Sequence, residues 1–173
     1  MKNVLNRCLA LLLLTGSMWA GGLTAAPAEM RVNPRSEVAL TIAVRDAQAL
    51  AAQRKDCRVM RVEGDSMLPF FGSGAVLVIR SVSVEKLKPG MVVVYRNRFN
   101  ETVAHRVVAQ SGAGNIVQGY NNDRADSTAV DAANLLGVVY ATFYSESPVA
   151  DANVMLAAAG VEKPAVVLAA SAR

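Results

Sequence analysis

Short runs of β-branched and apolar residues, separated by turn-forming residues, make up the chain from Cys57 to Tyr144. The separators are rich in glycine, proline and asparagine, which favour turns over strands. This texture predicts a mainly β domain of the barrel or sandwich type, with Asn97–Glu101 as a hairpin loop. The predicted strands are 57–63, 75–81, 91–97, 102–109, 115–119 and 135–144.

The segments on either side of these runs have a different pattern. Alanine and leucine at helical spacing predict a helix over 38–54, for which Ser36 is a candidate N-cap. Such a helix either packs on the domain or acts as a spacer that holds the domain away from a membrane. The alanine- and valine-rich range 147–173 predicts a short helix or an end without regular structure, and no function is assigned to it.

The N-terminus has the pattern of an export signal. Lys2 and Arg7 precede the apolar run Cys8–Leu14, and Ala26–Ala28 reads A-x-A. The whole apolar stretch is about 16 residues long, below the ~18–20 that a spanning helix needs. We therefore predict a cleaved signal peptide and a periplasmic or secreted protein, and leave open an uncleaved N-terminal membrane anchor. The predicted organisation is 1–28 signal or anchor, 29–56 helical spacer, 57–146 domain and 147–173 tail.

Charge and composition exclude several classes of function. Without Lys2 and Arg7, the 18 basic residues fall to 16, against 14 acidic residues, which gives no argument for nucleic-acid binding. Signal cleavage would leave Cys57 as the only cysteine, so no intrachain disulfide is expected. One histidine and one cysteine cannot fill a zinc site without carboxylates, and we predict neither a metal nor a cofactor.

The chemistry that the sequence offers is a serine and the single histidine of the chain. Ser66 lies in GDSMLP directly after a predicted strand, and His105 follows it by 39 residues. A serine hydroxyl becomes a useful nucleophile when a neighbouring base takes its proton. Gly64 permits a tight turn and Pro69 fixes the chain beyond it. The alternative interpretation is an ordinary hairpin loop with an incidental serine.

Alternation along TVAHRVV places His105 on one face of a strand with Val103 and Val107. A histidine in such a setting is either a hydrogen-bonded core residue or a general base. A carboxylate that orients the imidazole would complete a triad. GYNNDRADS offers Asp123 and Asp126, and spacing alone does not decide between these two residues or a solvated turn.

Taken together, four segments resemble the serine peptidase superfamily of type I signal peptidases and LexA-like self-cleaving repressors. VEGDSMLPFFGSGAVLVI is similar to its nucleophile box, and KLKPGMVVVYR is similar to the box "pGDiVvf". VAHRVVAQSGAG resembles the box of the general base, which is Lys in most bacterial members and His in the endoplasmic-reticulum and archaeal branch. GYNNDRADS with LLGVV resembles "GDN…DS…G.V". The four boxes span about 59–139 in the family's order.

The resemblance implies a signal-peptidase/LexA-like β-barrel-type fold and a serine endopeptidase. Ser66 would be the nucleophile, His105 the base and Asp126 the third member. The backbone N–H of Ser66, with Gly64, Asp65 and Met67 around it, would bind the oxyanion and substrate. The substrate would be an extended peptide or protein segment with small residues near the cut. Membrane association through the N-terminal segment is the other partner expectation.

Three departures from the family pattern keep other functions open. Tyr120 and Met91 stand where the boxes carry aspartate, and Gly64 stands where signal peptidases place an oxyanion-binding serine. Tyr120 and Met91 motivate an alternative, a catalytically inactive descendant that binds extended peptides by strand addition. A third hypothesis is self-processing in the chain's own N-terminal segment; Ala-Gly pairs occur at 20–21, 113–114 and 159–160.

Overall fold

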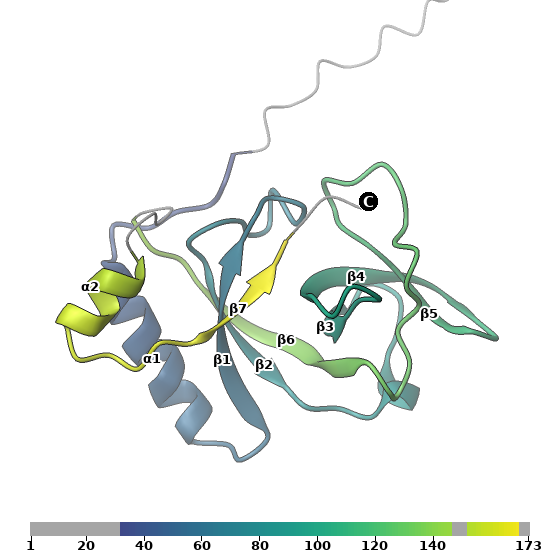
Figure 1. Cartoon of the computed structure of the whole chain (residues 1–173), viewed down its shortest axis with the longest axis horizontal. Helices are drawn as coiled ribbons and strands as arrows, with labels where there is room; N and C mark the ends of the chain where they lie inside the picture. Colours follow the sequence, from purple (N-terminus) through teal and green to yellow (C-terminus); the bar gives the residue numbers. More distant parts are fainter. Residues whose placement is uncertain (1–31, 147–151, 170–173) are drawn as a thin grey trace, which may run out of the picture.

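The strands of the protein form where the β-branched runs were predicted. The computed structural model describes residues 32–146 and 152–169 (Figure 1). Six strands match the six predicted runs to within two residues at each end, so the mainly β prediction is confirmed. The elements are α1 (Leu40–Ala52), β1 (Cys57–Glu63), β2 (Val76–Arg80), the 3₁₀ turn η1 (Val84–Lys86), β3 (Val92–Arg96), β4 (Thr102–Ser111), β5 (Gly114–Gln118), β6 (Leu135–Phe143), α2 (Ala152–Ala158) and β7 (Ala165–Leu168).

The described strands form one mixed sheet with the order β3-β6-β2-β1-β7-β4-β5. β3 also pairs with β4, from Val92↔Arg106 to Arg96↔Thr102, so the sheet bends back on itself. It is not a regular barrel, because the seam between β4 and β7 is a single residue pair, Val103↔Leu168. The loop over 97–101 joins β3 to β4 as predicted, with the Asn97 N–H donating to the Glu101 carbonyl.

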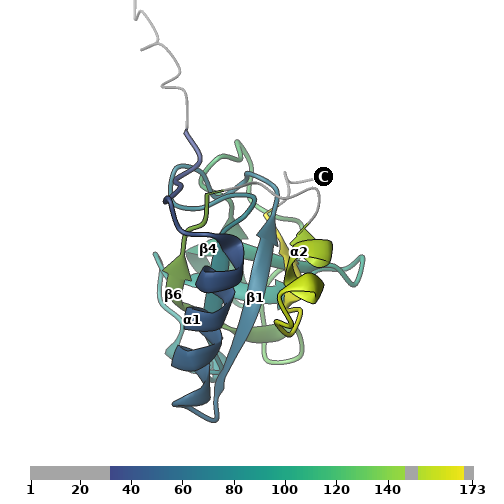
Figure 2. The ribbon, with the colours of Figure 1, turned by 90° about the vertical axis from the view of Figure 1, so that its left-hand side faces the viewer.

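The two helices lie together on one side of the molecule, with α1 against β1 (Figures 1 and 2). α1 forms because apolar residues recur at helical spacing and bury one face against the sheet. Ser36 is not its N-cap: the cap position is Ala39, without a side-chain bond, and the Ser36 hydroxyl donates to the Tyr144 carbonyl instead. The hydrophobic cluster shared by α1, α2 and the sheet contains Leu40, Ala43, Val44, Ala47, Ala51, Val76, Val78, Ala152, Leu156 and Val161.

The C-terminal range contains a strand that the sequence did not predict. α2 packs on α1, and β7 then runs parallel to β1 with the register Met60↔Ala165 to Glu63↔Leu168. The strand escaped prediction because AVVL is a four-residue apolar run without alternation, in a stretch that has no turn signal after it.

The predicted signal segment, residues 1–28, lies outside the described residues. Within 32–146 and 152–169, no helix has the length and apolar character to cross a bilayer.

The packing of α2 gives a direct test of whether the C-terminal range belongs to the folded unit. Leu156→Ala should lower the free energy of unfolding by about 2–5 kcal/mol, because it leaves a cavity in the cluster shared by α1, α2 and the sheet. Val154→Ala is the matched control, since Val154 on the same helix is 68% exposed. Urea denaturation measures both values, and equal stability of the two variants would show that α2 is not docked.

Candidate active site

The loop between β1 and β2 holds Ser66 in a fixed position. Gly64 has φ of 98°, a conformation that glycine adopts without strain, and its N–H donates to the Ser73 hydroxyl at 2.8 Å. Beyond the serine, Met67 and Phe71 are buried in the core formed by β1, β2 and β7. The loop is therefore anchored on both sides of Ser66.

His105 lies in the middle of β4, on the buried face that the alternation predicted. Val103 and Val107 beside it are 4% and 1% exposed, and His105 itself is 1% exposed. Its neighbour across the ladder is Val93 of β3. The imidazole therefore occupies a rigid position on the central part of a strand.

The loop that follows β5 carries Asp126, whose carboxylate lies beside His105. The Asp126 N–H donates to the Val117 carbonyl of β5, which fixes the backbone at that residue. Its Oδ2 lies 2.5 Å from Nδ1 of His105. Asp123 is exposed, so the structure resolves the choice that spacing left open, and Asp126 is the carboxylate beside the imidazole.

Ser66, His105 and Asp126 thus form a continuous hydrogen-bonded chain. Ser66 Oγ lies 2.8 Å from Nε2 of His105, and Nδ1 faces the Asp126 carboxylate. A carboxylate only accepts, so Nδ1 carries the proton and Nε2 is left to accept from the serine hydroxyl. This is the arrangement in which a histidine can act as a general base on a serine.

Tyr95 of β3 is a fourth member of this chain, and it was missed in the sequence. Its hydroxyl donates to Oδ2 of Asp126, the same oxygen that faces His105. Burial, with the hydrogen bond to Asp126 as a second cause, raises the pKa of Tyr95 far above its usual range, so the phenol stays a donor. The aromatic end of the "pGDiVvf" box marks this position, but that pattern says nothing of a hydroxyl.

The segment just after β5 also holds the nucleophile loop by its backbone. The Asn121 N–H donates to the Ser66 carbonyl at 2.7 Å, and the Asn121 side-chain amide donates to the Asp65 carbonyl at 3.2 Å. A Cβ on Gly119 would lie 2.7 Å from the Ser66 carbonyl oxygen, so only glycine permits this approach. The loop after β5 thus positions both Ser66 and the Asp126 carboxylate.

The residues predicted to bind the oxyanion or substrate lie around Ser66 in different ways. The Gly64 N–H donates to the Ser73 hydroxyl, the Asp65 side chain is exposed, and the Met67 side chain is fully buried in the core. The Ser66 N–H donates to the carbonyl oxygen of Ala169 at 2.8 Å. Ser66 itself is 3% exposed.

An apolar pocket of about 400 Å³ lies next to the nucleophile loop. Tyr120 and Met91, which stand where the family pattern carries aspartate, both line it. The Tyr120 ring stacks on Phe70 with centroids 4.2 Å apart, and the Arg106 guanidinium lies 4.4 Å above the Tyr120 centroid. Both residues therefore lie beside the loop that carries Ser66.

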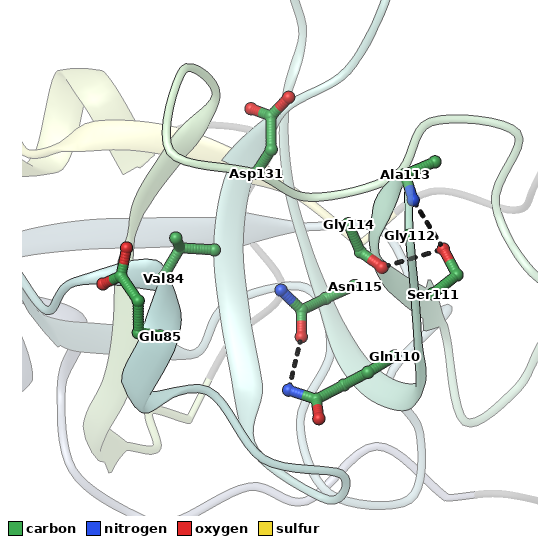
Figure 3. Close-up of a pocket in the computed structure, with 9 residues that line it drawn as sticks. All are labelled: Val84, Glu85, Gln110, Ser111, Gly112, Ala113, Gly114, Asn115 and Asp131. Carbon is green, nitrogen blue, oxygen red and sulfur yellow. Dashed lines mark hydrogen bonds between the residues drawn. The ribbon is translucent and has the colours of Figure 1, made fainter.

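A second pocket, of about 570 Å³, lies at the β4–β5 hairpin (Figure 3). Two pairs of its lining residues are hydrogen-bonded: the Gln110 amide donates to Asn115, and the Ser111 hydroxyl donates to the Gly114 carbonyl. It contains none of the triad residues. Within the described ranges, no group of three or more His, Cys, Asp or Glu side chains could hold a metal ion.

Neither a known family model nor a curated protein matches this chain.

Tyr95 leads to a pH-dependent prediction of stability. In the unfolded chain Tyr95 ionises near its usual pKa of 10.0, whereas the raised pKa keeps it neutral in the folded protein. Its contribution to stability is therefore present below about pH 10 and is lost above it. Above that pH the free energy of unfolding of the wild type should fall by about 1.4 kcal/mol per pH unit relative to that of Tyr95→Phe. The other titrating groups are the same in both proteins, so their effects cancel in the comparison. Urea denaturation between about pH 9 and 11 measures the difference, and parallel stability curves would contradict this account.

Gly119 gives a test of the contact between the two loops. Gly119→Ala should slow acylation of Ser66 by a serine-directed probe by about tenfold or more, because the new methyl displaces the Ser66 backbone. Gly112→Ala is the control, since nothing lies within 4 Å of a Cβ at that position. Equal labelling rates in the two variants, read by intact mass, would rule out this role of the contact.

Proposed function

We propose that this protein is a serine endopeptidase of the signal-peptidase/LexA-like type, acting on an extended peptide segment. The observation that carries the proposal is the chain of contacts from Ser66 Oγ through His105 to Asp126 Oδ2. Three separate segments supply its members, and backbone hydrogen bonds hold the serine and the aspartate in place. The order of the four boxes along the sequence supports the same function, with the histidine in the place of the base.

In the proposed reaction Ser66 Oγ attacks a peptide carbonyl while Nε2 of His105 takes its proton. The imidazolium is stabilised by Asp126, and it returns the proton to the leaving amine. Tyr95 donates to Asp126 throughout, so it acts as a positioning residue for the carboxylate. The Ser66 N–H is the proposed oxyanion donor, because such donors supply the largest electrostatic stabilisation in acyl transfer.

The non-catalytic alternative, a module that binds peptides by strand addition, is distinguished by reactivity. Strand addition needs only backbone edges, whereas a peptidase also needs an activated hydroxyl. A module without an activated Ser66 would bind an extended peptide equally well after Ser66→Ala.

A serine-directed acylating probe, read by intact mass, tests the proposal. The wild type should gain one adduct, Ser66→Ala and His105→Ala should gain none, and Asp126→Asn should label about 10⁴-fold more slowly. Ser111→Ala is the control and should label like the wild type, because Ser111 is exposed and far along β4.

Absence of an adduct both in a folded wild type and in Ala169→Asp, which should free the Ser66 N–H from the Ala169 carbonyl, would contradict the peptidase and favour the binding module. An adduct that survives in Ser66→Ala would show that another nucleophile is responsible.

A further inference from the structure

β7 lies between the two strands that supply the nucleophile and the base. β1 leads into the Ser66 loop, β4 carries His105, and β7 runs parallel to both (Figure 1). Leu168 is opposite Glu63 of β1 on one side and Val103 of β4 on the other. An extended substrate that paired with these two strands would occupy the same place.

The end of β7 reaches Ser66 through its backbone. The Ala169 N–H donates to the Glu63 carbonyl at 2.6 Å, and the Ala169 carbonyl accepts from the Ser66 N–H at 2.8 Å. The Ser66 N–H is the proposed oxyanion donor. The Ala169 carbonyl is therefore where the carbonyl of a bond to be cut would lie.

Gly64 makes this approach possible. A Cβ at Gly64 would lie 2.3 Å from the Ala169 carbonyl oxygen and 2.8 Å from its carbon. No larger residue fits there without displacing the end of β7. The positive φ of Gly64 and the close contact with Ala169 thus require glycine for two separate reasons.

The side chains of β7 alternate as those of a bound extended peptide would. Val167 and Ala169 are 0% and 1% exposed and belong to the same hydrophobic cluster as Met67. Leu168, between them, faces the other way and is partly exposed. With β7 in place, Ser66 and His105 are 3% and 1% exposed, and the Ser66 N–H already has the Ala169 carbonyl as its partner.

We propose that the C-terminal strand is the protein's own substrate, and that the chain cleaves itself after Ala169. This inference rests on the proposed peptidase function. The proposed cut is at the bond between Ala169 and Ala170. It replaces the N-terminal segment and the Ala-Gly pairs that the sequence suggested as sites of self-processing. Of those pairs, Ala159–Gly160 is at the end of α2, where the Ala159 carbonyl accepts from Arg45.

The reaction uses water as its only co-reactant. Ser66 Oγ bonds to the carbonyl carbon of Ala169, and its proton moves to Nε2 of His105. The C–N bond to Ala170 breaks, and the proton passes to the departing nitrogen, which leaves as a free amine. Water then attacks the ester, a proton returns through His105 to Ser66 Oγ, and the chain ends in the carboxylate of Ala169.

Intramolecular reaction follows from the way β7 is attached. α2 is packed in the core through Leu156, and the Gln48 side chain of α1 donates to the Glu162 carbonyl just before β7. The strand is therefore held beside Ser66 before any reaction begins, which favours attack within one chain over attack on a second molecule.

Intact mass of the purified full-length protein tests this proposal. The wild type should lack the residues after Ala169, which are Ala-Ser-Ala-Arg in this sequence, and Ser66→Ala should retain them. Ala170→Pro should also retain them with Ser66 unchanged, whereas Ala170→Ser should be cut like the wild type. Ser66→Ala incubated with wild type should stay intact, as expected for reaction within one chain.

Acylation of Ser66 separates failure of this inference from failure of the proposed function. The probe is applied to the wild type and to Ala169→Asp, whose buried carboxylate should displace the end of β7. A retained C-terminus with a labelled Ser66 would overturn self-cleavage and leave the peptidase standing. A retained C-terminus with no label in either protein would overturn both. Loss of the same residues in Ser66→Ala would assign the cut to another protease and overturn self-cleavage.

Discussion

The peptide unit of Ser66 is held from both sides, and the rest of the site depends on that restraint. Its N–H donates to Ala169 and its carbonyl accepts from Asn121. These two bonds join a turn after β1 to segments about 50 and 100 positions later in the chain. Long-range contacts of this kind cost loop-closure entropy, which the buried hydrophobic clusters on both faces of the sheet offset. The hydroxyl therefore meets the imidazole in one geometry.

The hydrogen bonds that connect His105, Asp126 and Tyr95 behind Ser66 are made in a largely buried setting. Asp126 has one carboxylate oxygen that accepts from both His105 and Tyr95, and its other oxygen is buried with no hydrogen-bond partner among the described residues. In a low-dielectric setting, hydrogen bonds to a charged acceptor are strong, and an unpartnered acceptor is costly. The Asp126 carboxylate thus lies on the face of His105 away from the serine.

The features that the sequence predicted, the strands and the buried face of His105, depend on local pattern. Runs of β-branched residues between turn-forming residues marked six strands, and alternation placed His105 on a buried face with Val103 and Val107. Spacing could not separate Asp123 from Asp126, because the choice is made by a hydrogen bond from the Asp126 N–H to β5. Tyr95 was missed for a related reason: a period of two predicts that a residue is buried and does not identify its partner. β7 was missed because its order comes from the two strands that flank it.

The position of β7 also matters to anyone who handles this protein. Any chain added after Ala169 starts next to the Ser66 backbone, whereas the described N-terminal end at Val32 is exposed and precedes α1. An affinity tag or fusion partner joined directly after Ala169 would therefore begin beside the peptide unit of Ser66.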